Sequence, residues 1–145
     1  NGVNITSSTT APFIVEDAKK VVVTLADGTT NTFTDSTRVA ADDEDYSAAV
    51  YSKADLTFNG NGTLNINAGY RNGIKSTDDL KIVSGTYNIT SNEDGIVGKD
   101  LLAVKTGIFN ITSCQDGMKS TYDKDDTKGN LILLHRQMEY SQSIY

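Results

Sequence analysis

The sequence predicts an all-β protein, a single-stranded parallel β-helix (a solenoid) with coils of about 22 residues. The first observation is a small residue followed by an apolar one, a pair that returns at intervals of 24, 22 and 22 residues. The second is a triplet with Asn between two apolar residues, the period of a strand with one buried face. The pairs are Ala49-Val50, Gly73-Ile74, Gly95-Ile96 and Gly117-Met118, and the triplets are Leu64-Asn65-Ile66, Tyr87-Asn88-Ile89 and Phe109-Asn110-Ile111.

Each repeat is too small to bury its own apolar side chains. Its expected strands have about three to five residues and are too short to form a stable sheet alone, whereas stacked copies share one core. A leucine-rich repeat is excluded because the Leu-x-x-Leu-x-Leu ladder is absent. We therefore expect internal ladders in which equivalent residues stack: Leu64 with Tyr87 and Phe109, Ile66 with Ile89 and Ile111, and Val50 with Ile74, Ile96 and Met118.

We treat the chain as one domain in three parts. Residues 1–48 are irregular: a β-branched run at 21–25, a turn at Asp27-Gly28 and a strand-like run at 30–34 predict either a hairpin or a degenerate coil. The acidic stretch within residues 40–49 predicts an exposed loop, with a metal site as the alternative. Residues 49–130 are the regular coils.

Residues 131–145 depart from the repeat and contain the only histidine, His135. Reading one base later can turn residues 135–140 into Thr-Gly-x-Trp-Asn-Ile, which matches Thr106 to Ile111 position for position. The tail is therefore either a frameshift product or a genuine cap, which solenoids require. An exposed final coil is an open sheet edge, so we expect a tendency to self-associate there.

Composition limits the partners. Nineteen acidic and thirteen basic residues give a net charge of -6 and a pI near 4.6, which disfavours nucleic acid and anionic membranes as partners. No apolar run approaches the roughly 18 residues that a membrane span needs, so we expect no membrane insertion. The single cysteine, Cys114, permits no intrachain disulfide. Because the chain begins at Asn1 without an initiator methionine, we expect a mature or trimmed segment.

Acidic residues at the repeated turns predict a calcium site. If Asp94 and Asp116 stack on consecutive coils, their carboxylates face each other at about 5 Å and repel. Calcium, with about six to eight oxygen ligands, would relieve that repulsion, and the absence of Cys or His argues against zinc or copper. The alternative is turn chemistry alone, with Asp bonded to the backbone and Gly at positive φ. The predicted ligands at this corner are Asn72, Asp78, Asp79, Asp94, Asp100, Asp116 and Asp123.

The central Asn of each triplet is expected to face away from the core. Such amides either stack along the helix axis or hydrogen-bond sugar hydroxyls, and both interpretations stay open. Lysines near the acidic turns either balance those acids or contact a ligand. The predicted ligand-binding residues are Asn65, Asn88, Asn110, Lys75, Lys99, Lys119 and Tyr70.

The sequence offers little for catalysis. It has no G-x-S-x-G motif, no phosphate-binding loop and no histidine in the repeats. Lys75, Lys99 and Lys119 are candidate bases for a calcium-dependent polysaccharide lyase. We therefore assign no catalytic residue and predict a non-catalytic binding module, with a lyase or a surface adhesin or stalk as alternatives.

Residues 48–100, AAVYSKADLTFNGNGTLNINAGYRNGIKSTDDLKIVSGTYNITSNEDGIVGKD, resemble the bacterial carbohydrate-binding-domain family of secreted, polysaccharide-lyase-like β-helices. The likeness rests on Asn72-Gly73-Ile74-Lys75-Ser76 and Asp94-Gly95-Ile96 and extends over about residues 20–129. It implies a right-handed parallel β-helix with calcium at Asp-rich corners. It also implies display on a bacterial surface and binding of plant cell-wall polysaccharide without demonstrated cleavage. Val97, the missing later coils and the tail depart from the family pattern.

Overall fold

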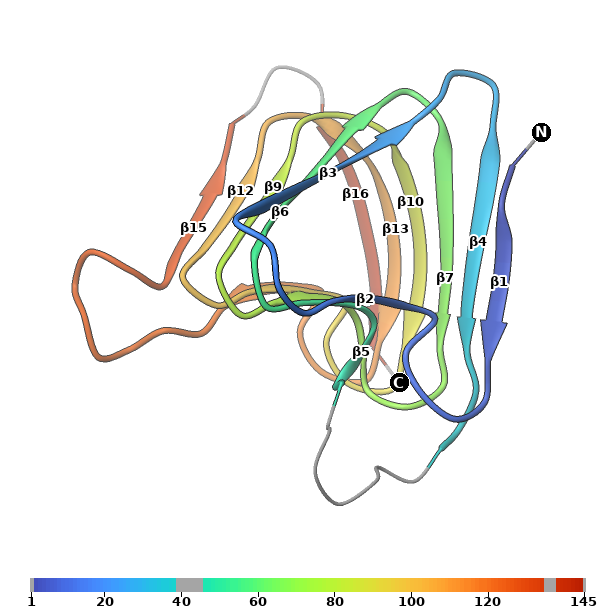
Figure 1. Ribbon diagram of the computed structural model, residues 1–145. Coiled ribbons are helices and arrows are strands. Elements are labelled where there is room, and N and C mark those ends of the chain that lie inside the picture. The colour runs from blue at the N-terminus through green and yellow to red at the C-terminus, as the bar shows by residue number, and fades with distance from the viewer. Residues whose placement is uncertain (1, 39–45, 135–137, 145) are drawn as a thin grey trace.

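The protein is a right-handed parallel β-helix. The computed structural model describes residues 2–38, 46–134 and 138–144, which form three parallel sheets and no helix. No helix long and apolar enough to span a membrane occurs among them. From β2 (Phe13–Val15) onward each coil places one strand in each sheet, and equivalent strands of successive coils lie side by side (Figure 1). This arrangement of three parallel sheets confirms the predicted fold class, and right-handed crossovers are the general rule for parallel strands.

We call the three sheets A, B and C. Sheet A contains β1 (Asn4–Ser7), β4 (Thr30–Asp35), β7 (Thr63–Ala68), β10 (Thr86–Ser91), β13 (Gly107–Ser113) and β16 (Met138–Ile144). Sheet B contains β2 (Phe13–Val15), β5 (Ala48–Ser52), β8 (Asn72–Ser76), β11 (Ile96–Gly98) and β14 (Met118–Ser120). Sheet C contains β3 (Lys20–Leu25), β6 (Asp55–Gly60), β9 (Asp79–Ile82), β12 (Leu101–Val104) and β15 (Asn130–Leu133). The strands have three to seven residues, slightly longer than expected.

The predicted internal ladders form the core. Leu64, Tyr87 and Phe109 pair in register between β7, β10 and β13 and are almost fully buried. The Tyr87 and Phe109 rings stack with centroids 5.2 Å apart, and the Tyr87 hydroxyl donates to the Ser84 carbonyl at 2.8 Å. The other two ladders are also in register. Burying each large side chain stabilises the fold by about 1.5–3 kcal/mol.

The N-terminal part forms a coil and not a hairpin. Strands β3 and β4 belong to different sheets and both run parallel to the next coil. The turn at Asp27-Gly28 is present, with Gly28 at φ 70°. Residues 46–49 are buried and the last two belong to β5, so the exposed loop expected at 40–49 is wrong there. Tyr46 and Ala48 pack in a buried apolar cluster with Ala11 and Tyr51. The acidic residues 42–45, with their alternative metal site, lie outside the described residues.

A buried ion pair closes the end of β4. The Arg38 guanidinium donates from Nε to Asp35 Oδ1 at 2.9 Å and from Nη2 to Oδ2 at 3.2 Å, and both side chains are almost fully buried. Arg38 also donates to the Tyr46 carbonyl and lies over the Tyr70 ring, 4.0 Å from its centroid. This clamp joins Arg38, the last described residue before the acidic stretch, to Tyr46, the first described residue after it.

The tail extends the β-helix by one coil. Strand β15 pairs with β12, and β16 pairs with β13 so that Met138 lies opposite Gly107 and Tyr140 opposite Phe109. The one-base-shifted sequence would place its Trp at position 138 opposite Phe109, two residues out of this register. The pairing of β15 and β16 does not test how the tail arose, so the frameshift stays a hypothesis about the gene.

Candidate functional site

The outward face of sheet A carries the predicted Asn ladder. Asn65, Asn88 and Asn110 lie in register on β7, β10 and β13. Asn110 Nδ2 donates to Asn88 Oδ1 at 2.8 Å, and Asn88 Nδ2 donates to Asn65 Oδ1 at 2.8 Å. Asn65 Nδ2 continues the series to Thr32 Oγ1 at 3.4 Å. The amides therefore stack along the helix axis, as one of the two interpretations expected.

An open groove runs beside this ladder. Its volume is about 410 Å³ and it crosses four neighbouring strands of sheet A. Strand alternation produces it, because the intervening apolar residues point into the core and leave polar side chains outside. Its lining consists of Thr32, Asn65, Asn67, Asn88, Ile89, Thr90, Asn110 and Thr112. None of these residues carries a charge.

The corner between sheets A and B uses its acids as backbone acceptors. Asn72 Oδ1 accepts the Asp94 N–H at 3.0 Å, and Asp94 Oδ1 accepts the Asp116 N–H at 3.0 Å. Asp94 Oδ2 pairs with Lys119 Nζ at 2.7 Å, and Asp116 pairs with the same amine at 3.5 Å. Both Asp94 oxygens and the Asn72 amide oxygen therefore already have protein partners, which leaves Asn72 and Asp94 poorly suited to hold calcium.

The glycines at that corner serve close packing. We expected positive φ there, but among the described glycines positive φ occurs elsewhere, at Gly28, Gly60, Gly85, Gly107 and Gly129. A Cβ on Gly95 would lie 2.5 Å from the Gly117 carbonyl oxygen and 2.5 Å from Ile111 Cγ2. Gly73 has the same contacts one coil earlier. The expectation was wrong because the coil spacing, and not the turn conformation, excludes a side chain.

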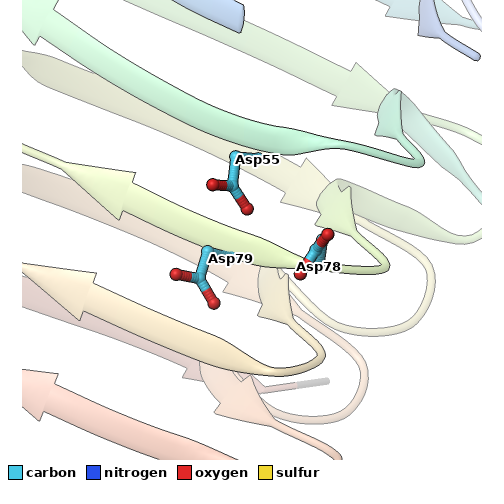
Figure 2. Close-up of side chains that lie close together, drawn as sticks. All are labelled: Asp55, Asp78 and Asp79. Atoms are coloured by element: carbon cyan, nitrogen blue, oxygen red, sulfur yellow. The ribbon is translucent and has the colours of Figure 1, made fainter. Parts of the chain in front are cut away.

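The corner between sheets B and C gathers three carboxylates. Asp55, Asp78 and Asp79 each offer an oxygen within 4.8 Å of the others (Figure 2). Asp55 begins β6, Asp79 begins β9, and Asp78 precedes β9. Burial, followed by the negative charges of Asp55, Asp100 and Asp79, raises the pKa of Asp78. Asp55 was absent from the predicted ligands, although its repeated Asp-Leu step could have identified it.

Lysines partly balance this acidic corner. Lys81 pairs with Asp79 at 2.8 Å, and Lys128 pairs with Asp100. The Asp79 hydrogen bond raises the pKa of Lys81, and the Asp100 hydrogen bond raises that of Lys128. An open groove of about 630 Å³ adjoins the corner. It is lined by Asp55, Asp78, Asp79, Asp100, Leu101, Thr127, Lys128, Asn130 and Ile132.

The structure divides the predicted metal ligands between two corners. Asn72, Asp94 and Asp116 lie at the corner between sheets A and B, whereas Asp78, Asp79 and Asp100 lie between sheets B and C. A strand of sheet B separates the two sets, so the single shared corner we expected is wrong. Asp123 is exposed in the loop between β14 and β15 and is not among the three clustered carboxylates.

The remaining predicted ligand residues are dispersed. Lys75 lies on sheet B and donates to Ser47 Oγ at 2.9 Å. Lys99 is exposed beyond β11, with Nζ 5.3 Å from the Tyr122 ring centroid. Tyr70 lies under Arg38, which occupies one face of its ring. Of the predicted ligand residues, the three Asn side chains line the groove on sheet A.

Comparison with known proteins agrees with this architecture. A family model described as carbohydrate-binding domain-containing protein matches residues 1–138. A carbohydrate-binding domain-containing protein of Acetivibrio thermocellus is 43% identical over 93 residues, which cover 62% of this chain and 32% of the relative.

A solved structure, the gadolinium derivative of the polysaccharide lyase-like protein from C. thermocellum, is also similar. It matches with a TM-score of 0.87 and 34% identity, over 92% of this chain and 55% of the other. The chain thus spans about a third of the first relative and about half of the second. Because the family model covers most of the 145 residues, the chain belongs to the family of carbohydrate-binding domain-containing proteins.

Proposed function

We propose that this protein is a secreted, non-catalytic module that binds plant cell-wall polysaccharide, cellulose or a pectin-like polymer, at the bacterial surface. The observation that carries the proposal is the groove on sheet A, a polar, uncharged surface that repeats along the helix axis. Repeated weak contacts along a polymer raise avidity without a deep pocket. Membership of a carbohydrate-binding family supports the same assignment.

The charge state of the lysines supports a binding role. A lyase needs a base that is neutral near its working pH. Burial lowers the pKa of Lys119, but its bonds with Asp94 and Asp116 outweigh that effect and raise it. The pKa values of Lys81 and Lys128 are also raised. Lys119, the one candidate base among these three, is therefore a charge partner of Asp94 and Asp116, as Lys81 and Lys128 are of Asp79 and Asp100.

We place the proposed calcium at Asp55, Asp78 and Asp79. Carboxylate oxygens are the ligands that calcium prefers. Burial and then the charges of the neighbouring carboxylates raise the pKa of Asp78, and a cation would relieve that repulsion. When bound there, calcium would stabilise the corner and bridge to uronate carboxylates, which a protein of net charge -6 otherwise repels. The protein's own role is to hold three oxygens close together beside an open groove.

The double variant Asp78→Asn/Asp79→Asn is expected to remove the stabilisation by calcium. Ion binding to the native state alone stabilises by about 2.7 kcal/mol at a calcium concentration of 100 times the Kd. Melting curves with calcium and with chelator measure this difference. Asp116→Asn is the control and should keep the calcium effect, since Asp116 lies at the other corner. If the calcium effect survives in Asp78→Asn/Asp79→Asn and disappears in Asp116→Asn, calcium binds at the corner between sheets A and B and not where we propose.

Binding itself is tested with two polymers. We expect the protein to co-sediment with cellulose and to be retarded in gels containing polygalacturonate and calcium. Steady release of unsaturated products absorbing in the ultraviolet would instead identify a lyase. Retention by neither polymer, together with capture of a protein partner, would favour the adhesin or stalk.

We also propose that the terminal coil mediates self-association. Leu131 and Leu133 are in register with buried Leu102 and Val104, yet are 43% and 51% exposed. Sheet A has one strand more than the other two sheets. If two copies stacked head to tail, β1 of the second copy would therefore need the place that β16 of the first copy occupies. We therefore expect the C-terminal ends of two copies to meet, so that Leu131 and Leu133 of each copy are covered. Sedimentation velocity at rising concentration, with Leu133→Glu as the variant that should stay monomeric, tests this contact.

A further inference from the structure

We propose that the groove on sheet A binds an uncharged, extended β-linked glucan chain laid along the helix axis, and that this binding needs no calcium. The inference rests on the proposed polysaccharide-binding function. It adds the class of polymer, the direction in which the chain runs and the independence of this site from the acidic corner.

The lining of the groove favours a neutral polymer. The protein has 32 charged residues (13 basic and 19 acidic) among 145, yet none of the described residues that line this groove is charged. A uronate chain would therefore lay carboxylates against amides and hydroxyls without a cation to balance them. Losing water around an unpaired charge is costly, whereas sugar hydroxyls exchange water for amide and hydroxyl partners.

The hydrogen bonds of the Asn ladder leave one donor and one acceptor of the Asn88 amide available to a ligand. A side-chain amide has two N–H groups and a carbonyl oxygen with two lone pairs. At Asn88 the ladder uses one N–H, toward Asn65, and one lone pair, toward Asn110. One N–H and one lone pair remain, with the amide plane held by both neighbours. Adjacent hydroxyls of a sugar can use both, one as acceptor and one as donor, and the fixed amide reduces the entropy lost on binding.

The direction of the chain follows from the repeat. Two parallel rows border the groove: Asn65, Asn88 and Asn110 form one, and Asn67, Thr90 and Thr112 form the other. Along the axis both rows repeat at the strand spacing of about 4.8 Å, close to the length of one pyranose residue in an extended β-linked chain. A chain in this direction meets an equivalent pair of side chains at every coil. A chain running along a strand would meet the side chains of one coil only.

The groove and the acidic corner are on different parts of the solenoid. The groove lies on the outward face of sheet A, whereas Asp55, Asp78 and Asp79 lie where sheet B meets sheet C. In Figure 1 the strands β7 and β10 are on the opposite side of the helix from β6 and β9. Calcium at the acidic corner therefore contributes no contact to a chain in the groove.

Titration calorimetry with cellohexaose tests the site through a matched pair of variants. Thr90→Val keeps the β-branched shape and removes a hydroxyl that lines the groove, and Thr86→Val makes the same change on the same strand outside it. We expect Thr90→Val, and Asn88→Ala more strongly, to weaken binding about fivefold to tenfold for each hydrogen bond removed. Thr86→Val should bind like the unmodified protein, and melting curves show whether each variant is folded.

The same titration is repeated with chelator and with excess polygalacturonate plus calcium. We expect the cellohexaose affinity to stay unchanged in both. Loss of binding in chelator, competition by polygalacturonate, or equal effects of Thr86→Val and Thr90→Val would overturn the inference. Binding of polygalacturonate alone would overturn it and leave the proposed function standing, whereas failure to bind any glycan would contradict the proposed function itself.

Discussion

Replacing Gly95 with alanine is expected to destabilise the β-helix by at least about 3 kcal/mol, the upper end of the usual cost of overpacking a core. The added methyl would lie 2.5 Å from the Gly117 carbonyl oxygen and 2.5 Å from Ile111 Cγ2. That carbonyl accepts the Ile96 N–H at 3.0 Å, so the oxygen cannot withdraw without weakening the contact between two coils. The midpoint and slope of urea unfolding measure the change.

Gly28→Ala is the control for this prediction. Gly28 has φ 70°, and a methyl group added there would have no atom of a more distant residue within 4 Å. Alanine at this position therefore meets backbone strain but no steric contact, and a residue other than glycine in this conformation costs about 1–2 kcal/mol. If Gly28→Ala destabilises as much as Gly95→Ala, close approach between coils is not what requires Gly95.

The second large effect is expected for Arg38→Met, which leaves the carboxylate of Asp35 buried without its partner. Breaking a buried ion pair in this way costs about 3–5 kcal/mol. The Asp35 side chain is fully buried and its two oxygens accept from the guanidinium. Lys53→Met is the control, because Lys53 and Glu16 form a pair at 2.9 Å with about half of each side chain exposed. Such an exposed pair contributes little to stability.

The pH dependence of the Arg38→Met variant gives a separate test. Burial raises the pKa of Asp35 although the Arg38 hydrogen bond opposes this, so removing Arg38 should raise it further. A carboxyl with a raised pKa in the folded state favours folding at low pH, and that contribution disappears as the pH rises through the folded pKa. The stability deficit of Arg38→Met relative to the unmodified protein should therefore be smaller near pH 4 than at pH 7. A deficit that is equal at both values would contradict an unpaired buried charge.

The amino-acid sequence by itself determined the coil and its core. Parallel strands in register place equivalent residues of each repeat directly above one another, so the spacing of Leu64, Tyr87 and Phe109 was enough to predict their ladder. The Asn ladder followed from the same register and from strand alternation. The hairpin considered for residues 21–34 failed because a local turn signal does not specify whether the next strand pairs at once or enters another sheet.

Only the tertiary structure decided what the acidic residues do. Asp94 and Asp100 are close in sequence, but β11 lies between them and carries the chain from one corner of the coil to the next. Asp94 is then occupied by the Asp116 N–H of the following coil and by Lys119, whereas Asp55 joins Asp78 from the preceding coil. These partners are set by packing between coils. The spacing of residues along the chain indicates which side chains stack. It does not show which of their oxygens already take part in hydrogen bonds or ion pairs.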